Sequence, residues 1–96
     1  MPSPNIPQEL RQAWAKIHGF KLREMIKAEC PDVEVRSCDS KRRHYKLKGK
    51  VRTVNLYAST GTISVEPHGD MKGFNQRLMM PERAIKRAVT IANIGY

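Results

Sequence analysis

The chain has 96 residues, which is enough for one domain with one modest core. Its hydrophobic fraction of 40% is too high for a disordered chain, and no apolar run approaches the roughly 20 residues that cross a bilayer. The formal net charge of +9 favours an anionic partner.

Residues 1–7 contain three prolines and are interpreted as a flexible lead-in to a single α+β domain spanning residues 8–96. This terminus has neither the basic nor the apolar region of a secretory signal. Cys30 and Cys38 are too few for a disulfide framework. We therefore expect a cytoplasmic protein in a reducing setting, with no membrane partner.

Two helices are predicted before residue 30. Apolar residues from Leu10 onward recur at the i, i+3, i+4, i+7 spacing of one helical face. A second apolar stripe begins at Leu22 and is rotated by roughly 100° from the first. The pattern predicts helices over about 7–18 and 20–29, with a bend near Gly19.

Between residues 33 and 66 the apolar period changes to two, which is typical of half-buried strands. Four such segments are predicted, and short turns at Gly49-Lys50 and at 59–61 join the last three into an antiparallel meander. The inward side chains are Val54, Leu56, Ile63 and Val65. The opposite side of the sheet, which we call the open face, is predicted to carry Arg42, His44, Lys46 and Lys48, and with them Thr53, Asn55, Tyr57, Thr62 and Ser64.

Residues 67–80 contain proline and glycines and are predicted to form a loop whose methionines close the end of the core. Pro81 begins a last helix, and Gly95 is its stop signal. The complete prediction is an α+β fold of order α-α-β-β-β-β-α. It has a four-stranded antiparallel sheet, with the N-terminal helices and one C-terminal helix packed on one face.

The excess positive charge is concentrated in residues 41–52, KRRHYKLKGKVR, which we call the basic segment. It holds seven Lys/Arg and no acid, whereas residues 1–40 sum to zero charge. Same-face side chains of a strand are about 7 Å apart, a spacing of the same order as that between successive phosphates of a nucleic-acid strand. A second basic row, Arg83, Lys86 and Arg87, is interpreted as a solvated helix face behind the sheet.

These observations predict a small, non-enzymatic nucleic-acid-binding protein. The predicted site comprises Lys41, Arg42, Arg43, His44, Lys46, Lys48, Lys50, Arg52, Asn55, Tyr57 and Thr62. The cations contact the backbone, Tyr57 stacks on a base, and Asn55 and Thr62 form hydrogen bonds. Lysines that protect a sheet against edge aggregation are the alternative explanation, but seven like charges exceed that need. The kind of nucleic acid and the oligomeric state stay open.

Metal and catalytic chemistry have less support. Cys30, Cys38, His44 and His68 have a spacing that matches no structural zinc site, so neither a metal nor another cofactor is predicted. No Walker loop or G-x-S-x-G motif occurs, and no enzyme activity is predicted. His44 is the candidate for acid–base chemistry beside a phosphodiester.

Residues 53–69, TVNLYASTGTISVEPHG, resemble the strand–turn–strand of TATA-binding-protein-like domains, including the N-terminal domain of ribonuclease HIII. The shared features are Ser59 and Gly61 in the turn and Gly69 after the second strand. The helix ERAIKRAVTIANIGY is similar to their closing helix. This resemblance covers about residues 20–96. It implies a curved sheet whose concave face, lined by Asn55 and the threonines, grips a duplex or hybrid.

The stretch HYKLKG, followed by TISVEPHGD and a terminal helix, resembles HicA-type toxins, which have a double-stranded-RNA-binding-domain-like fold. That resemblance implies RNA cleavage by a histidine near the start of a strand, a position that His44 matches. Arg42 and Arg43 stand where the family has Gly-Ser.

A different class of function also explains a positive patch. Short, basic, stand-alone chains are common in phages and plasmids. Some are inhibitors or adaptors that dock on an acidic host protein or on the nucleic-acid site of a nucleoprotein complex. The sequence does not separate this function from direct nucleic-acid binding.

Overall fold

The computed structural model describes residues 7–17, 19–39 and 43–95, which form three helices and five strands. In chain order these are α1 (Gln8–Ala15), α2 (Gly19–Glu29), β1 (Glu34–Asp39), β2 (His44–Lys48), β3 (Thr53–Tyr57), β4 (Thr62–Val65), β5 (Phe74–Gln76) and α3 (Pro81–Ile94). The α+β class is confirmed, but the predicted number of strands is wrong by one. Apart from Pro7, the predicted lead-in lies outside the described residues.

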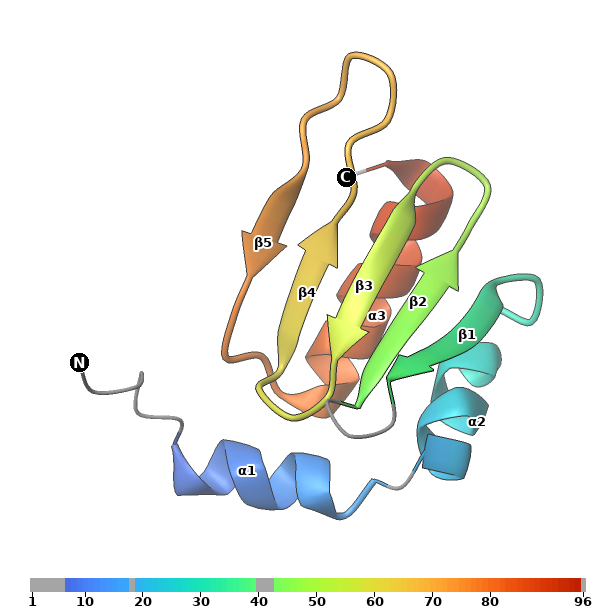
Figure 1. The fold of residues 1–96 in the computed structure, drawn as a ribbon. Helices are drawn as coiled ribbons and strands as arrows, with labels where there is room; N and C mark the ends of the chain where they lie inside the picture. The colour runs from blue at the N-terminus through green and yellow to red at the C-terminus, as the bar shows by residue number, and fades with distance from the viewer. Residues whose placement is uncertain (1–6, 18, 40–42, 96) are drawn as a thin grey trace.

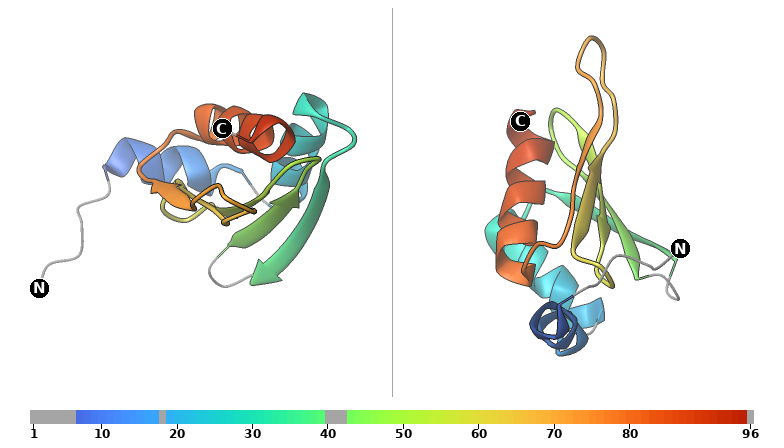
Figure 2. Two further views of the ribbon diagram at one scale, coloured as in Figure 1. Left: turned by 90° about the horizontal axis from the view of Figure 1, so that it is seen from above. Right: turned by 90° about the vertical axis from the view of Figure 1, so that its left-hand side faces the viewer.

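The molecule has two layers (Figure 1). The strands form one antiparallel sheet in the order β1-β2-β3-β4-β5, so the predicted meander is confirmed and extended. Helix α3 packs against the central strands, with α2 beside it, and both lie on the same side of the sheet (Figure 2). Helix α1 crosses the end of the sheet where β3 turns into β4. No helix in the described residues covers the opposite side of the sheet.

The helix ends follow the predicted signals. Pro7 immediately precedes α1, and Pro81 occupies the first turn of α3. Gly95 ends α3 in the left-handed conformation, with φ 106°, which glycine adopts at little cost. The break between α1 and α2 confirms the predicted bend near Gly19, although α1 is shorter than the predicted 7–18.

The core lies between the helices and the sheet. The four residues that were predicted to point inward are all buried: Val54, Leu56, Ile63 and Val65. The largest fully buried side chains include Trp14, Leu22, Ile26, Leu47, Leu56, Ile63, Ile85 and Ile91. The indole Nε1 of Trp14 donates a hydrogen bond to the carbonyl of Met79 at 2.9 Å. This bond fixes α1 to the segment that leads into α3.

The turn between β2 and β3 packs directly on the end of α3. A Cβ atom at Gly49 would lie 2.5 Å from the carbonyl oxygen of Ala92, so only glycine allows this approach. The backbone N–H groups of Val51 and Arg52 both donate to that same oxygen, each at 2.9 Å. The turn therefore supplies donors that the last turn of the helix lacks.

Residues 67–80 are not entirely a loop. Within them Phe74–Gln76 forms β5, which pairs with β4 and places Phe74 opposite Val65. This strand has only 3 residues, FNQ, which is too short for an apolar alternation to be recognised. The prediction that the methionines close the core holds for Met79 alone, since Met71 and Met80 are exposed.

Candidate nucleic-acid interface

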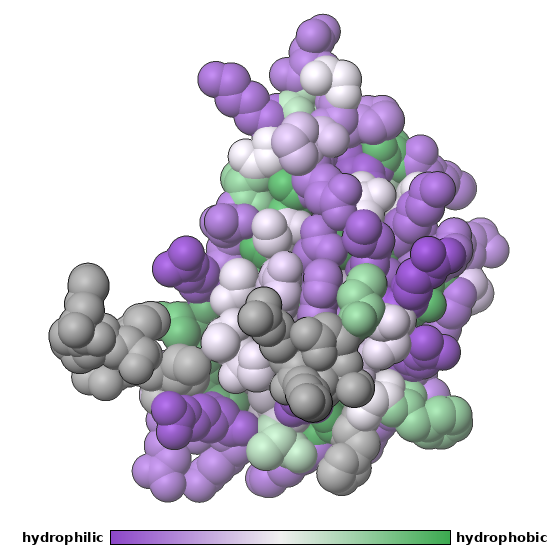
Figure 3. Space-filling model, in the orientation of Figure 1, coloured by the Kyte–Doolittle hydropathy of each residue, from purple (hydrophilic) through white to green (hydrophobic). Residues whose placement is uncertain are grey.

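The open face is built from alternate residues of four strands, which lie opposite one another in the observed register. It comprises Glu34 and Arg36 of β1, His44, Lys46 and Lys48 of β2, Thr53, Asn55 and Tyr57 of β3, Thr62 and Ser64 of β4, and Glu66 just after β4. Figure 3 views the molecule from this side and shows hydrophilic side chains over most of the strands. The alternation predicted for β3 and β4 is therefore confirmed.

Two rings stack on this face. His44 and Tyr57 are opposite residues of β2 and β3, and their ring centroids are 4.4 Å apart at an interplanar angle of 15°. Both side chains are partly exposed. Cross-strand ring pairs of this kind stabilise a sheet, and each ring keeps one face that its partner ring does not cover.

A chain of polar contacts holds the histidine. The Nε2 atom of His44 lies 2.8 Å from Oδ1 of Asn55, and Nδ2 of Asn55 donates to Oε2 of Glu66 at 2.8 Å. The same carboxylate oxygen lies 3.4 Å from Nζ of Lys46. Asn55 is only 8% exposed. Its predicted contact with a ligand is therefore wrong, and it instead positions its neighbours.

The partners of Asn55 determine the tautomer of the histidine. A carboxylate and a carbonyl only accept hydrogen bonds, so the Asn55 amide nitrogen must face Glu66 and the backbone oxygen of Ser64. Its oxygen then faces His44, which must donate from Nε2. In the neutral ring, Nδ1 is therefore the basic nitrogen.

The same contacts lower the pKa of Glu66. The main cause is the hydrogen bond from Asn55, which favours the ionised carboxylate, while partial burial opposes it. The positive charge of Lys46 adds to the lowering. Glu66 is thus an anion among the cations of the open face. The predicted site did not include it, although the strand alternation places it on this face.

A shallow hollow of about 260 Å³ lies at the β1 side of the open face. Its lining consists of Glu34, Arg36, Lys46, Lys48, Thr53 and Glu66. Three cations and two anions therefore meet here, from β1, from β2 and from the residue just after β4. The basic residue that the sequence-based site omitted is Arg36, which lies opposite Lys46. A strand-pairing argument that included β1 would have found it.

Arg43 does not serve the predicted site. Its guanidinium donates from Nη1 to the carbonyl of Trp14 at 3.0 Å and from Nη2 to the carbonyl of Ile17. Both carbonyls lie at or just beyond the C-terminal end of α1, where helix carbonyls lack partners in the helix. The backbone of Arg43 is left-handed, with φ 53°. The prediction of a phosphate contact is corrected to a helix-capping role.

Arg52 is also turned away from the predicted site. Its side chain is buried, with 4% exposure, and its guanidinium donates to three backbone carbonyls. Nη1 reaches Gly95 at 3.0 Å, while Nη2 reaches Glu66 at 2.9 Å and Lys72 at 2.8 Å. The cation also lies 5.7 Å from the ring centre of Phe74. A phosphate cannot reach it, so this predicted contact is wrong.

The other predicted residues are less closely grouped. Lys41 and Arg42 lie outside the described residues. Lys50 is exposed in the turn between β2 and β3, beyond the strands of the open face. Thr62 lies on the open face, where its Oγ1 is 2.8 Å from Oγ1 of Thr60. Of the five cations of the basic segment that the structure describes, the open face receives Lys46 and Lys48.

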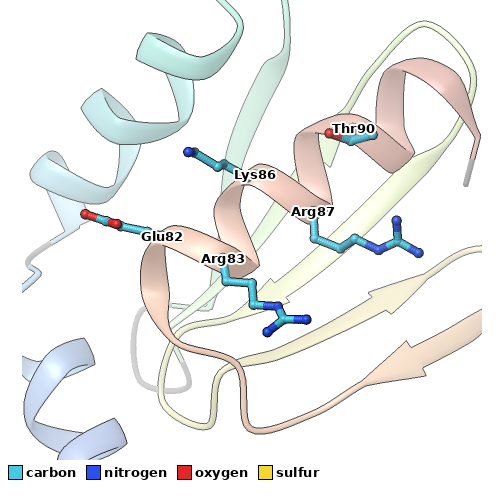
Figure 4. A pocket seen from close by; sticks show the side chains of 5 residues that line it. All are labelled: Glu82, Arg83, Lys86, Arg87 and Thr90. Atoms are coloured by element: carbon cyan, nitrogen blue, oxygen red, sulfur yellow. The ribbon is translucent and has the colours of Figure 1, made fainter.

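The second basic row lies on the far side of the sheet, as predicted. Arg83, Lys86 and Arg87 line a shallow hollow of about 450 Å³ on the outer face of α3, together with Glu82 and Thr90. Figure 4 shows the two arginines pointing toward the strands and Lys86 pointing toward α2. Arg87 also donates from Nε to Oε1 of Gln76 at 3.4 Å. This row and the open face therefore lie on opposite sides of the sheet.

Neither cysteine of the described residues is disulfide-bonded. Cys30 accepts a hydrogen bond from the Asn93 amide, and Cys38 is exposed on β1. No group of three or more His, Cys, Asp or Glu side chains gathers at one point in the described part of the chain. None of the helices described is long and apolar enough to cross a bilayer.

Comparisons of the chain with protein-family models, with characterised proteins and with solved structures found no match. The resemblances to TATA-binding-protein-like domains and to HicA-type toxins therefore stay predictions.

Proposed function

We propose that the chain binds nucleic acid on the open face of its sheet. The observation that carries this proposal is that the His44–Tyr57 ring pair shares one uncovered face with the cations on β1 and β2. Aromatic rings on a sheet stack on unpaired bases, and flanking cations follow the phosphate backbone. Arg36, Lys46 and Lys48 are the phosphate contacts that this arrangement offers.

The spacing of these groups supports a single-stranded ligand. Neighbouring strands are about 4.8 Å apart, and same-face residues along one strand are about 7 Å apart. A base stacked on Tyr57 and phosphates at Lys46 and Lys48 then lie within two or three nucleotides of one another. A duplex would offer these rings no base to stack on, because its bases are already stacked on one another.

Binding measured across a salt series tests the proposal. For a single strand, log affinity should fall with log salt with a slope of about −0.7 for each phosphate contact, so three contacts give about −2. Lys48→Ala should lower the affinity mainly at low salt and reduce the slope by about one contact. Tyr57→Ala should weaken binding by about 1–3 kcal/mol at every salt concentration, because stacking is not screened.

Lys86→Ala is the matched control, because it removes the same charge from the outer face of α3. It should leave the affinity close to that of the unchanged protein. Equal losses from Lys86→Ala and Lys48→Ala would show that the open face is not the site. A protein that binds no single strand, duplex or hybrid leaves docking on an acidic protein surface as the explanation of the charge.

Cleavage of RNA is a second candidate, favoured by the way in which His44 is held. The contacts of Asn55 fix the Nε2 proton, so Nδ1 is positioned as a base that accepts the proton of a ribose 2′-hydroxyl. Wild-type protein should then cut labelled RNA, and His44→Gln should bind the same RNA without cutting it. Intact RNA after incubation with wild-type protein eliminates this candidate and leaves binding alone.

A further inference from the structure

Strand β1 lies at one edge of the sheet, and among the described residues only β2 pairs with it. Its charged side chains are accessible: Glu34 is 62% exposed and Arg36 is 74% exposed, and within one copy Nη2 of Arg36 lies 3.9 Å from Oε1 of Glu34. At this exposure that long contact contributes little, so both side chains can turn to an opposite partner. The ladder between β1 and β2 is regular from Glu34 to Ser37, and a bulge follows. The outer row of N–H and C=O groups on such an edge is a template for another strand.

The charge pattern of β1 is complementary to itself. In a regular antiparallel pair, directly opposite residues point to the same face of the sheet. If two copies of β1 pair around Val35, Glu34 of each copy lies opposite Arg36 of the other. Pairing around Glu34 or around Arg36 instead places like charges directly opposite, which is destabilising. One register is therefore favoured over its neighbours.

We propose that β1 pairs with β1 of a second copy of this chain, antiparallel and centred on Val35. Two Glu34–Arg36 pairs form on the open face, and the two Val35 side chains meet on the opposite face. The sheet then continues through both copies, and their open faces become one surface. The hollow that Glu34 and Arg36 line lies next to this junction, on the β2 side of β1. The proposal concerns strand pairing alone and does not rest on nucleic-acid binding.

Charge reversal with rescue tests the register. In sedimentation equilibrium without nucleic acid, the unchanged protein should show a concentration-dependent dimer. Glu34→Arg and Arg36→Glu should each weaken it by about tenfold, because each change turns both opposite-charge pairs into like-charge pairs. The double variant restores the two pairs and should recover the original affinity. Glu9→Arg on α1 makes the same charge change as Glu34→Arg and should have no effect.

Cysteine cross-linking tests the centre of the pair. With Cys30→Ala and Cys38→Ser in place, Val35→Cys sets two thiols on opposite residues. Their Cα atoms would lie about 4.5–5.5 Å apart, which a disulfide spans. Under mild oxidation Val35→Cys should form a covalent dimer at least about ten times faster than Ser37→Cys, whose copies would lie about 13 Å apart.

Three outcomes would overturn the proposal. The first is a wild-type protein that stays monomeric at about 1 mM, where even a weak strand pair is half formed. The second is a double charge variant as defective as either single variant. The third is a Ser37→Cys protein that cross-links as fast as Val35→Cys. Circular dichroism of each variant separates loss of pairing from loss of folding.

Discussion

Among the described residues of the basic segment, the arginines and the lysines have different tasks. Arg43 and Arg52 both turn toward the protein and donate to backbone carbonyls. Lys46, Lys48 and Lys50 extend toward solvent, and only the first of them has an acidic partner among the described residues. A run of like charge in the sequence therefore divides into structural cations and surface cations once the chain is folded.

The chemistry of the two side chains explains this division. A guanidinium has five N–H donors in a fixed planar fork, so one arginine can join several carbonyls from different elements. An ammonium is a strongly hydrated point charge, and burying it costs more. Counting charges thus overestimates the charge available to a ligand. Counting the cations that the strand alternation places on one face of the sheet is the better guide here.

Arg52→Met should produce the largest effect, because it removes the donors to Gly95, Glu66 and Lys72 while keeping most of the buried volume. Three backbone carbonyls then lose this partner, and the hydrogen bond to Gly95 is the fully buried one. We expect a loss of about 3–5 kcal/mol in the free energy of unfolding, measured by urea denaturation. Arg52→Lys should lose less, since one ammonium still reaches some of these oxygens.

Arg52→Met also tests whether Arg52 is a structural cation and not a ligand contact. Under conditions where Arg52→Met is still folded, its affinity for a single strand and its salt slope should match those of the unchanged protein. If a folded Arg52→Met protein bound the single strand more weakly, Arg52 would have to contact the ligand.

The open face was predictable from the sequence, whereas the burial of Arg52 was not. Strand alternation correctly separated Leu56 from Tyr57 and located the open face, because a period of two is a local property of the chain. The burial of Arg52 depends on carbonyls 14, 20 and 43 residues away, which no local pattern contains. Strand β5 was missed for the same reason, since its pairing with β4 rather than its own residues defines it.

Substitutions of Arg43 should have an intermediate effect on stability, and two variants can be compared directly. Arg43→Ala removes the guanidinium that caps α1 and should cost about 1–2 kcal/mol of stability. Arg43→Gly removes the same group but relieves the left-handed backbone at φ 53°, so it should be more stable than the alanine variant by about 1 kcal/mol. Thermal unfolding of the two proteins side by side measures the difference. Equal stability would mean that the backbone conformation carries no strain.

The smallest expected change in stability comes from Glu66→Gln, which removes the acidic partner of Lys46. Asn55 and Lys46 lower the pKa of Glu66 in the folded protein, whereas the unfolded chain has the usual value of about 4.3. The stabilisation from ionised Glu66 is therefore present above that pH and is lost as the pH falls through the lower, folded-state pKa. Glu66→Gln should accordingly be less stable than wild type at pH 7 and equally stable in strong acid.

The size of this difference is limited because the Glu66 side chain is 41% exposed, so solvent screens its contact with Lys46. We expect less than about 1 kcal/mol, measured by urea unfolding at several pH values. The consequence for binding should be easier to detect. Glu66→Gln releases Lys46 and removes a negative charge from the open face, so affinity for a single strand should rise at low salt. The salt slope should steepen by up to one contact if Lys46 is only partly engaged in the unchanged protein. An unchanged slope and an unchanged affinity would place the ligand away from Lys46 and with it away from the open face.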